Sequence, residues 1–301
     1  MPLLKVIILA IVQGLAELLP VSSSAHVVVA EKLMGLNPSA PEMTLLLVML
    51  HTGTMFAVIV YFWSRWRASY LSSAAAFQWI AGRIVLATVL TGVIGEGLVK
   101  VIEHTLFRGH PHAEIEDLFS RLDLIAPALA LVGLLIIIAG LLEKRRMGGS
   151  SADPSLTHRE SLSSRQSGLS MRQSGWIGAM QGLCLPFRGF SRSGATISTG
   201  MLVGVGKERA EEFSFALAVV LTPPVILREV LRLMKAEHLS GGVPLASAMV
   251  PSLLGAVFAF LAGLLALKWL SRWLEGGRWY LFGIYCLVAA GVVFALYRSG
   301  Y

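Results

Sequence analysis

Six apolar segments, each about as long as a bilayer is thick, constrain this chain more than any other feature of its sequence. A helix needs about 20 apolar residues to cross the hydrocarbon core of a membrane. The segments that meet this length are residues 43–63, 83–102, 122–142, 213–234, 246–270 and 279–297. They predict an all-α polytopic membrane protein with six full spans.

The composition excludes several other classes of protein. Apolar residues make up 55% of the 301 residues and charged residues only 14%, whereas a soluble chain carries about 25% charged residues. A disordered protein and a protein with a single anchor are therefore excluded, and an ordinary soluble enzyme is disfavoured. Cys184 and Cys286 lie inside apolar segments, where they give neither a disulfide framework nor a metal-ligand spacing.

The net charge of +7 does not predict nucleic-acid binding, because no basic face with interleaved aromatic residues is present. The basic residues lie at the ends of apolar segments, which suits anchoring at lipid headgroups and control of topology. If the connection 63–83 is cytoplasmic, more than half of the 25 Lys and Arg residues are cytoplasmic and the segment 104–121 is external. Three histidines in that external segment lie near acidic residues without a definite ligand spacing, so we expect no metal there: His104, His110 and His112, near Glu114, Glu116 and Asp117.

Two further apolar regions, 3–36 and 174–205, are broken by polar residues and proline. Such a backbone is tolerated at membrane depth only where it is buried in protein or lines a cavity. Gln13-Gly14-Leu15 opens the first region and Gln181-Gly182-Leu183 the second, and each is followed by proline, hydroxyl residues and three spans. Three spans per half reverse the second half relative to the first. We therefore expect a first repeat (1–147), a flexible polar linker (148–173) and a second, inverted repeat (174–301), with a binding site between the repeats.

Ionisable side chains at membrane depth are candidates for function by default, and the first broken region contains Glu17 and His26. Gln13 and Glu17 are four residues apart and share one helix face, and the proline at position 20 ends that helix. Ser22 and Ser23 follow at the start of a second helix, where N–H groups favour an anion. Ser23 and His26 form a hydroxyl–imidazole pair of the kind that serves as nucleophile and base, although this spacing alone is weak evidence.

The second broken region has the composition of a phosphate site. Gly189 and Gly194 allow close approach of the backbone to a ligand, and Arg192 offers a guanidinium fork for phosphate oxygens. Hydroxyl donors are supplied by Ser191, Ser193 and Thr196. The structural alternatives are that these serines only cap a helix, and that Arg192 and Glu17 each belong to a structural ion pair or snorkel to the membrane surface. For His51, within the first span, we favour a packing role over a place in the cavity.

At these two motifs the chain resembles the bacterial undecaprenyl-diphosphate phosphatase family, also called the bacitracin-resistance proteins. The first family motif reads Glu-Gly-x-x-Glu-Phe-Leu-Pro-Val-Ser-Ser-Thr-Gly-His, and residues 13–26 match it with Gln13 and Ala25 as departures. The second reads Pro-Gly-x-Ser-Arg-Ser-Gly-Ala-Thr, and residues 188–196 match it with Arg188 in place of proline. One extra residue also lies between Gln181 and Ser191, and the later run 212–215 is similar to family sequence.

The resemblance implies an integral-membrane phosphatase of the bacterial inner membrane, with inverted repeats and two re-entrant helical hairpins. Such an enzyme removes the terminal phosphate of a polyprenyl diphosphate on the periplasmic side, recycles the lipid carrier of peptidoglycan synthesis and confers bacitracin resistance. By motif position, Glu17, Ser23, His26 and Arg192 inherit the catalytic roles. The supporting positions for the substrate are Ser22, Ser191, Ser193, Thr196, Arg188 and Gln13. Glu17 is also the expected ligand of a divalent cation, Mg or Ca.

Several alternatives stay open at this point. Ser23 could be the nucleophile with His26 as its base, His26 could itself attack, or a metal-activated water could do so. Inverted repeats with broken helices are also transporter architecture, so a lipid-phosphate transporter or flippase is the alternative function. The expected partners are the lipid substrate, the bilayer and, as an open case, a second copy of the chain.

Overall fold

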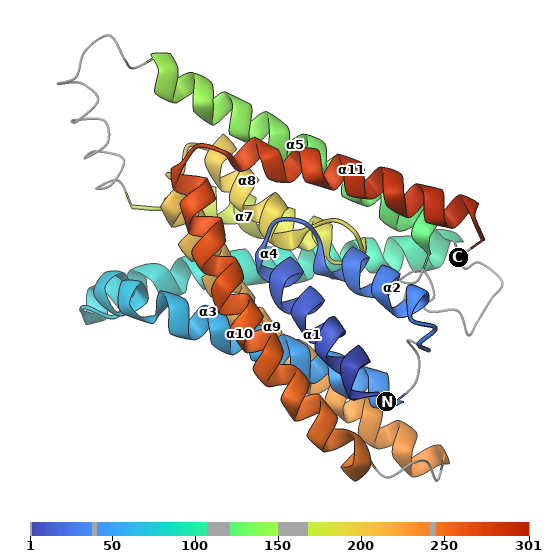
Figure 1. Cartoon of the computed structure of the whole chain (residues 1–301). Coiled ribbons are helices and arrows are strands. Elements are labelled where there is room, and N and C mark those ends of the chain that lie inside the picture. The colour runs from blue at the N-terminus through green and yellow to red at the C-terminus, as the bar shows by residue number, and fades with distance from the viewer. Residues whose placement is uncertain (1, 38–40, 107–120, 150–167, 241–244, 301) are drawn as a thin grey trace. The chain divides into compact units, whose positions relative to one another are not determined.

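The computed structural model describes residues 2–37, 41–106, 121–149, 168–240 and 245–300, and the regular secondary structure in these ranges is helical (Figure 1). Four helices are short: α1 (Leu3–Leu18), α2 (Ser23–Leu33), α7 (Met171–Cys184) and α8 (Arg192–Leu202). Six are long: α3 (Pro41–Ser69), α4 (Ala74–Leu106), α5 (Leu122–Gly149), α9 (Lys207–Ser240), α10 (Leu245–Glu275) and α11 (Trp279–Arg298).

The six long helices are long and apolar enough to cross a membrane. Their candidate spans are Glu42–Ser69, Ala74–Thr105, Leu122–Arg146, Lys207–Leu231, Met249–Leu274 and Trp279–Arg298. Each overlaps one of the segments predicted from the apolar pattern, so the all-α, multi-pass membrane class is confirmed.

The two broken regions form helical hairpins. α1 packs against α2 and α7 packs against α8, with connections at residues 19–22 and 185–191. The longest of the four helices, α1, has 16 residues, which at about 1.5 Å per residue gives about 24 Å, less than the ~30 Å of a hydrocarbon core. None of the four is therefore long enough to span, as the polar breaks predict. That both hairpins are re-entrant stays a prediction.

The chain divides into two compact units, and each takes helices from both halves of the sequence. Unit 1 comprises Met1–Leu19, Ser23–Arg65 and Phe215–Leu270, and unit 2 comprises Pro20–Ser22, Trp66–Ser214 and Ser271–Tyr301. These units are defined by packing, whereas the predicted repeats are defined by internal similarity. The repeat boundaries therefore stay a prediction, and the linker 148–173 lies largely outside the described residues.

Unit 1 packs α1 and α3 against α10 through small residues. A Cβ at Gly14 would lie 2.6 Å from Ala262 Cβ and 2.7 Å from the carbonyl oxygen of Ala259. A Cβ at Gly53 of α3 would overlap the carbonyl of Ala256. Such close backbone approach through small residues is typical of helix packing in membranes. The apolar core around this contact consists of Val6, Leu9, Ala10, Val27, Met43, Leu46, Leu50 and Ala259.

In unit 2, α7 packs against α4 in the same way. A Cβ at Gly182 would lie 2.9 Å from the carbonyl oxygen of Thr91, and one at Gly178 would overlap the backbone of Ala87. Gly182 is the glycine of the second Gln-Gly-Leu tripeptide, and Gly14 is the glycine of the first. The glycine of each tripeptide thus lets a short helix pack closely against a span from the other half of the chain.

The contact between α5 and α11 is also reciprocal. A Cβ at Gly133 of α5 would lie 2.9 Å from the carbonyl oxygen of Gly283 of α11, and a Cβ at Gly283 would lie 2.5 Å from the carbonyl oxygen of Gly133. The two helices therefore cross with backbone against backbone, inside unit 2.

Candidate active site

Three predicted site residues meet at one carboxylate oxygen in unit 1. Glu17 lies in the last turn of α1, and its side chain is 16% exposed. Ser23 Oγ, at the first residue of α2, donates to Glu17 Oε2 across 2.5 Å. Gln13 Nε2, one turn earlier on α1, donates to the same oxygen across 3.1 Å. Hydrogen bonds to an ionised acceptor are short and strong, so this geometry holds the Ser23 hydroxyl with its proton directed at Glu17.

His51 of α3 also lies near this group. Our expectation that it has a packing role stays a prediction. His51 Nε2 lies 3.8 Å from Glu17 Oε2, and the side chain is 44% exposed. His51 Nδ1 lies 2.8 Å from the carbonyl oxygen of Leu47. Because a carbonyl only accepts, we assign the proton of this bond to Nδ1, which leaves Nε2 facing Glu17. The sequence signal was a polar histidine within an apolar span, but the spacing along the chain did not connect it to Glu17.

The turn between α1 and α2 is strained. Ser22 is buried and has a φ of 68°, and within the described ranges it is the one residue other than glycine with a positive φ. For an L-residue this conformation costs about 1–2 kcal/mol, and such strain tends to be kept at functional sites. The turn reverses the chain so that α2 begins with Ser23 beside Glu17.

His26 lies one turn beyond Ser23 on α2 and is partly buried. The two residues are three apart in a helix, so they share a face as predicted. The acceptor found for the Ser23 hydroxyl is Glu17, and a role for His26 as base or nucleophile stays a prediction.

The second motif builds the start of α8 in unit 2. Gly189 has a φ of 95°, and a Cβ there would lie 2.6 Å from the carbonyl oxygen of Ile125, so this position requires glycine. Arg188, just before it, is partly buried. Ser191 is the N-cap of α8, and its Oγ accepts from the N–H of Gly194 across 3.2 Å. Ser191 therefore caps α8, and a further role of this residue in substrate binding stays a prediction.

The N-terminus of α8 combines the positive end of the helix dipole with the Arg192 side chain. Arg192 is the first residue of the helix and is partly buried. Ser193 follows it, buried, with its Oγ 3.4 Å from that of Ser191. The N–H groups of a first helical turn carry partial positive charge and favour anions. This end of α8 therefore has the electrostatics that the phosphate hypothesis requires.

The rest of α8 is held firmly by its neighbours in unit 2. Thr196 Oγ1 donates to the carbonyl of Arg192 across 2.8 Å and lies 2.5 Å from Ser214 Oγ of α9. At the other end, Arg146 Nη1 donates to the carbonyl of Met201 across 3.2 Å, which places a cation at the negative end of the helix dipole. All residues from 193 to 201 are buried, so this polar helix is enclosed by protein, as its composition requires.

Within unit 2, the turn 20–22 of the first motif packs near the start of α8. A Cβ at Gly194 would lie 3.3 Å from Pro20 Cβ and 2.8 Å from Ile136 Cδ1. Cys286 Sγ of α11 donates to the carbonyl of Pro20 across 3.4 Å. Gly194 is thus closely packed by Ile136 of α5 and, at a longer distance, by Pro20 of the first motif, which the sequence pattern did not indicate.

The side chains near Glu17 offer a divalent cation few protein ligands. The described residues contain no group of three or more His, Cys, Asp or Glu side chains that could hold a metal ion. Mg²⁺ is commonly held by one or two carboxylates together with substrate phosphates. Glu17 therefore fits as a single protein carboxylate that shares a cation with substrate oxygens.

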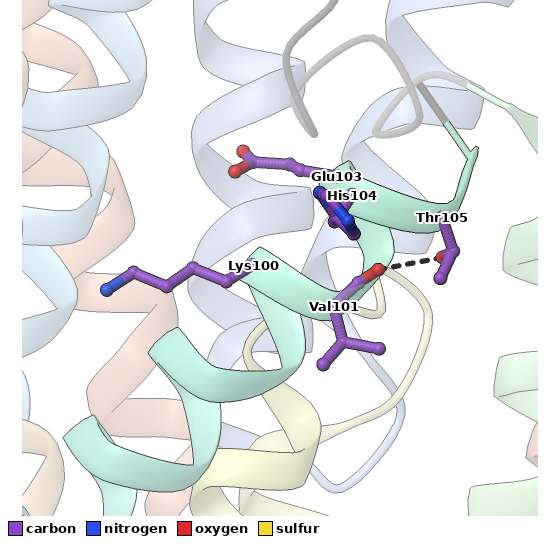
Figure 2. A pocket seen from close by; sticks show the side chains of 5 residues that line it. All are labelled: Lys100, Val101, Glu103, His104 and Thr105. Atoms are coloured by element: carbon purple, nitrogen blue, oxygen red, sulfur yellow. Dashed lines mark hydrogen bonds between the residues drawn. The ribbon is translucent and has the colours of Figure 1, made fainter. Parts of the chain in front are cut away.

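A surface pocket lies along the last turns of α4 and is lined by no residue of either motif (Figure 2). Its lining residues are Lys100, Val101, Glu103, His104 and Thr105. Thr105 Oγ1 donates to the carbonyl of Val101 across 2.7 Å, which is a bond within the helix. Of the histidine tract considered in the sequence, His104 lies here, and His110, His112, Glu114, Glu116 and Asp117 lie outside the described residues.

Comparison with known proteins agrees with the motifs. Residues 6–292 match the family model of the bacitracin resistance protein BacA. The chain is 56% identical to undecaprenyl-diphosphatase 2 of Acinetobacter baylyi, over 98% of both chains. It is 33% identical to an undecaprenyl-diphosphatase of Desulfosudis oleivorans over 95% of both chains. It is 31% identical to undecaprenyl-diphosphatase 2 of Burkholderia ambifaria, over 98% of this chain and 96% of the relative. The chain therefore belongs to the BacA family of bacitracin resistance proteins.

Proposed function

We propose that this protein hydrolyses undecaprenyl diphosphate to undecaprenyl phosphate and inorganic phosphate. Its membership of the BacA family and the names of its full-length relatives support this activity. The observation that carries the proposal is the hydrogen bond of 2.5 Å from Ser23 Oγ to Glu17 Oε2. A hydroxyl directed at a carboxylate is arranged for nucleophilic attack on a phosphate, whereas the transport of lipid phosphate does not call for such a pair.

In the proposed mechanism, Ser23 Oγ attacks the terminal phosphorus and gives its proton to Glu17. The bond from that phosphorus to the bridging oxygen breaks, and undecaprenyl phosphate leaves. The proton on Glu17 passes to the leaving phosphate oxygen. Water then attacks the phosphoserine and gives one proton to Glu17, the bond from phosphorus to Oγ breaks, and Glu17 returns that proton to Ser23 Oγ, which releases inorganic phosphate and restores the hydroxyl. Arg192 and the first turn of α8 bind phosphate oxygens and stabilise the charge that develops on them. Gln13 holds the Glu17 carboxylate in place.

We propose that a divalent cation, Mg or Ca, takes part when substrate is bound. Glu17 would be its protein ligand, and the remaining ligands would be phosphate oxygens and water. The chemistry that the cation supplies is neutralisation of the diphosphate charge.

We place the protein in the bacterial inner membrane, with the site open to the periplasm. Arg65 and Arg67 at the end of α3 and Arg83 near the start of α4 flank one connection, which fits a cytoplasmic loop under the positive-inside rule.

The test is phosphate release by the purified, detergent-solubilised protein from undecaprenyl and farnesyl diphosphates, with and without EDTA. Arg192→Ala should lose at least ~100-fold in kcat/KM, as expected for removal of a contact to transition-state charge. The matched control is Arg121→Ala, because Arg121 is an exposed residue that pairs with Asp123. Equal turnover in Arg192→Ala and the wild type would refute the assignment of Arg192.

Two further measurements separate the alternatives. Rapid quench with labelled substrate, followed by peptide mapping, should place the label on Ser23. A label on His26 would make His26 the nucleophile, and full activity with no label would leave a water as nucleophile. A protein that releases no phosphate, yet moves lipid phosphate across liposomes, would be a transporter instead.

A further inference from the structure

We propose that Ser214 of α9 is a positioning residue that holds Arg192 in its working orientation through Thr196. The proposal rests on the proposed function of Arg192 as a phosphate-binding residue. It concerns a side chain of another helix, outside both motifs. The sequence pattern did not connect this side chain with the phosphate site.

The direction of the hydrogen bond between Ser214 and Thr196 follows from proton counting. Thr196 Oγ1 has one proton, and it lies 2.8 Å from the carbonyl oxygen of Arg192, which only accepts. The same Oγ1 lies 2.5 Å from Ser214 Oγ. We assign the Thr196 proton to the nearer carbonyl, that of Arg192. With this assignment, Ser214 donates to Thr196, and Thr196 donates to Arg192.

Ser214 selects one of two bonds that Thr196 can make. In a helix, a threonine hydroxyl can reach the carbonyl three or four residues earlier, in two different rotamers. Thr196 Oγ1 lies 3.4 Å from the carbonyl oxygen of Ser193 and 2.8 Å from that of Arg192. A donor on α9 at 2.5 Å holds the hydroxyl in the second position, which ties the first turn of α8 to the α9 helix.

The burial of both hydroxyls makes the link specific. Ser214 and Thr196 are each 0% exposed, so water cannot replace a lost partner, and a buried hydroxyl without a partner is costly. Within the described residues, the side chain of Ser214 has Thr196 as its hydrogen-bond partner. Removing the Ser214 hydroxyl should therefore loosen the carbonyl of Arg192, and with it the guanidinium.

A second buried hydroxyl on α8 provides a matched control. Ser198 Oγ accepts from Trp279 Nε1 of α11 across 3.0 Å, and Ser198 is 0% exposed. This link also ties α8 to a neighbouring helix, but it lies farther from Arg192 along α8. If cross-linking of α8 were merely structural, Ser198→Ala and Ser214→Ala would have similar effects.

The experiment is a double-mutant cycle on phosphate release. Ser214→Ala should lower kcat/KM by about 10-fold in the wild-type background and should have no further effect in Arg192→Ala, because the residue acts through Arg192. Thr196→Val should show the same pattern, and Ser198→Ala should change kcat/KM by less than about 2-fold. Thermal unfolding of each variant checks that the protein is folded.

Binding of inorganic pyrophosphate, measured by calorimetry, provides a readout that does not need hydrolysis. Ser214→Ala should weaken it by about 10-fold where Arg192 is present and not where Arg192 is replaced. Equal factors in both backgrounds, or no effect of Ser214→Ala in either, would overturn the positioning role. A wild type that binds pyrophosphate in this Ser214-dependent way but releases no phosphate would instead refute the proposed hydrolysis and leave the positioning role standing.

Discussion

The hydroxyl of Ser23 and the carboxylate of Glu17 are already joined, oxygen to oxygen across 2.5 Å, by a bond that spans the turn between α1 and α2. The two residues are six positions apart, and the strained turn at Ser22 is what brings them together. The proposed nucleophile and its proposed proton acceptor are thus held together by the local fold of one hairpin.

Glu17→Gln should lower kcat by about 10²–10⁴-fold, the usual contribution of general base catalysis. An amide in this position cannot take up the Ser23 proton. Gln13→Ala removes a neutral donor to the same oxygen and should cost about 10-fold. Phosphate release under saturating substrate measures both, and similar losses in the two variants would argue against Glu17 as the base.

His51→Ala should lower kcat/KM by about 10-fold, because the side chain borders the carboxylate without being its direct hydrogen-bond partner. Thr52→Val is the control on the same helix, since Thr52 Oγ1 donates to the carbonyl of Val48 within α3. Steady-state kinetics with undecaprenyl diphosphate compares them. If both variants keep full activity, the His51 side chain does not contribute to catalysis.

The effect of a Ser22 substitution on stability should depend on whether the new residue tolerates a positive φ, rather than on its polarity. Ser22→Val should destabilise the protein by about 1–2 kcal/mol or more, because a β-branched residue is unfavourable at positive φ. Ser22→Asn should be tolerated, since asparagine enters the left-handed region readily. Thermal unfolding in detergent tests this, and equal melting temperatures for the two variants would show that the turn is not strained in solution.

Gly182→Ala should destabilise the protein by about 1–3 kcal/mol, the usual cost of overpacking. The added Cβ would meet the carbonyl of Thr91 on α4. Gly92→Ala on α4 is the matched control, because a Cβ there has no atom within 4 Å, and alanine favours the helix by about 1 kcal/mol. The melting temperature should therefore fall for the first variant and hold or rise for the second.

Most of the fold could be predicted from the sequence, because the length of apolar segments is dictated by the bilayer. Six uninterrupted stretches predicted six long helices, and the breaks at Pro20 and near Pro186 predicted two pairs of short ones. The helices that pack against the glycines of the two Gln-Gly-Leu tripeptides could not be predicted. Gly14 packs on α10 and Gly182 packs on α4. Those contacts join residues far apart in the chain, which local patterns do not encode.

The candidate site could be predicted where its residues lie close together in sequence. Gln13, Glu17 and Ser23 follow from helix periodicity and a proline break. The contacts of His51 and Ser214 could not be predicted in this way, because each residue reaches its partner from a separate helix. A polar side chain within an apolar span indicates that something faces it, but the partner becomes known only from the packing of the helices.

The crossing of α5 and α11 has a consequence for which residues each helix tolerates there. Gly133 and Gly283 approach each other's carbonyls, so the two positions are coupled. A side chain added at either glycine would meet the backbone of the other helix, and a compensating change at the partner position could not remove that overlap because the partner has no side chain to give up.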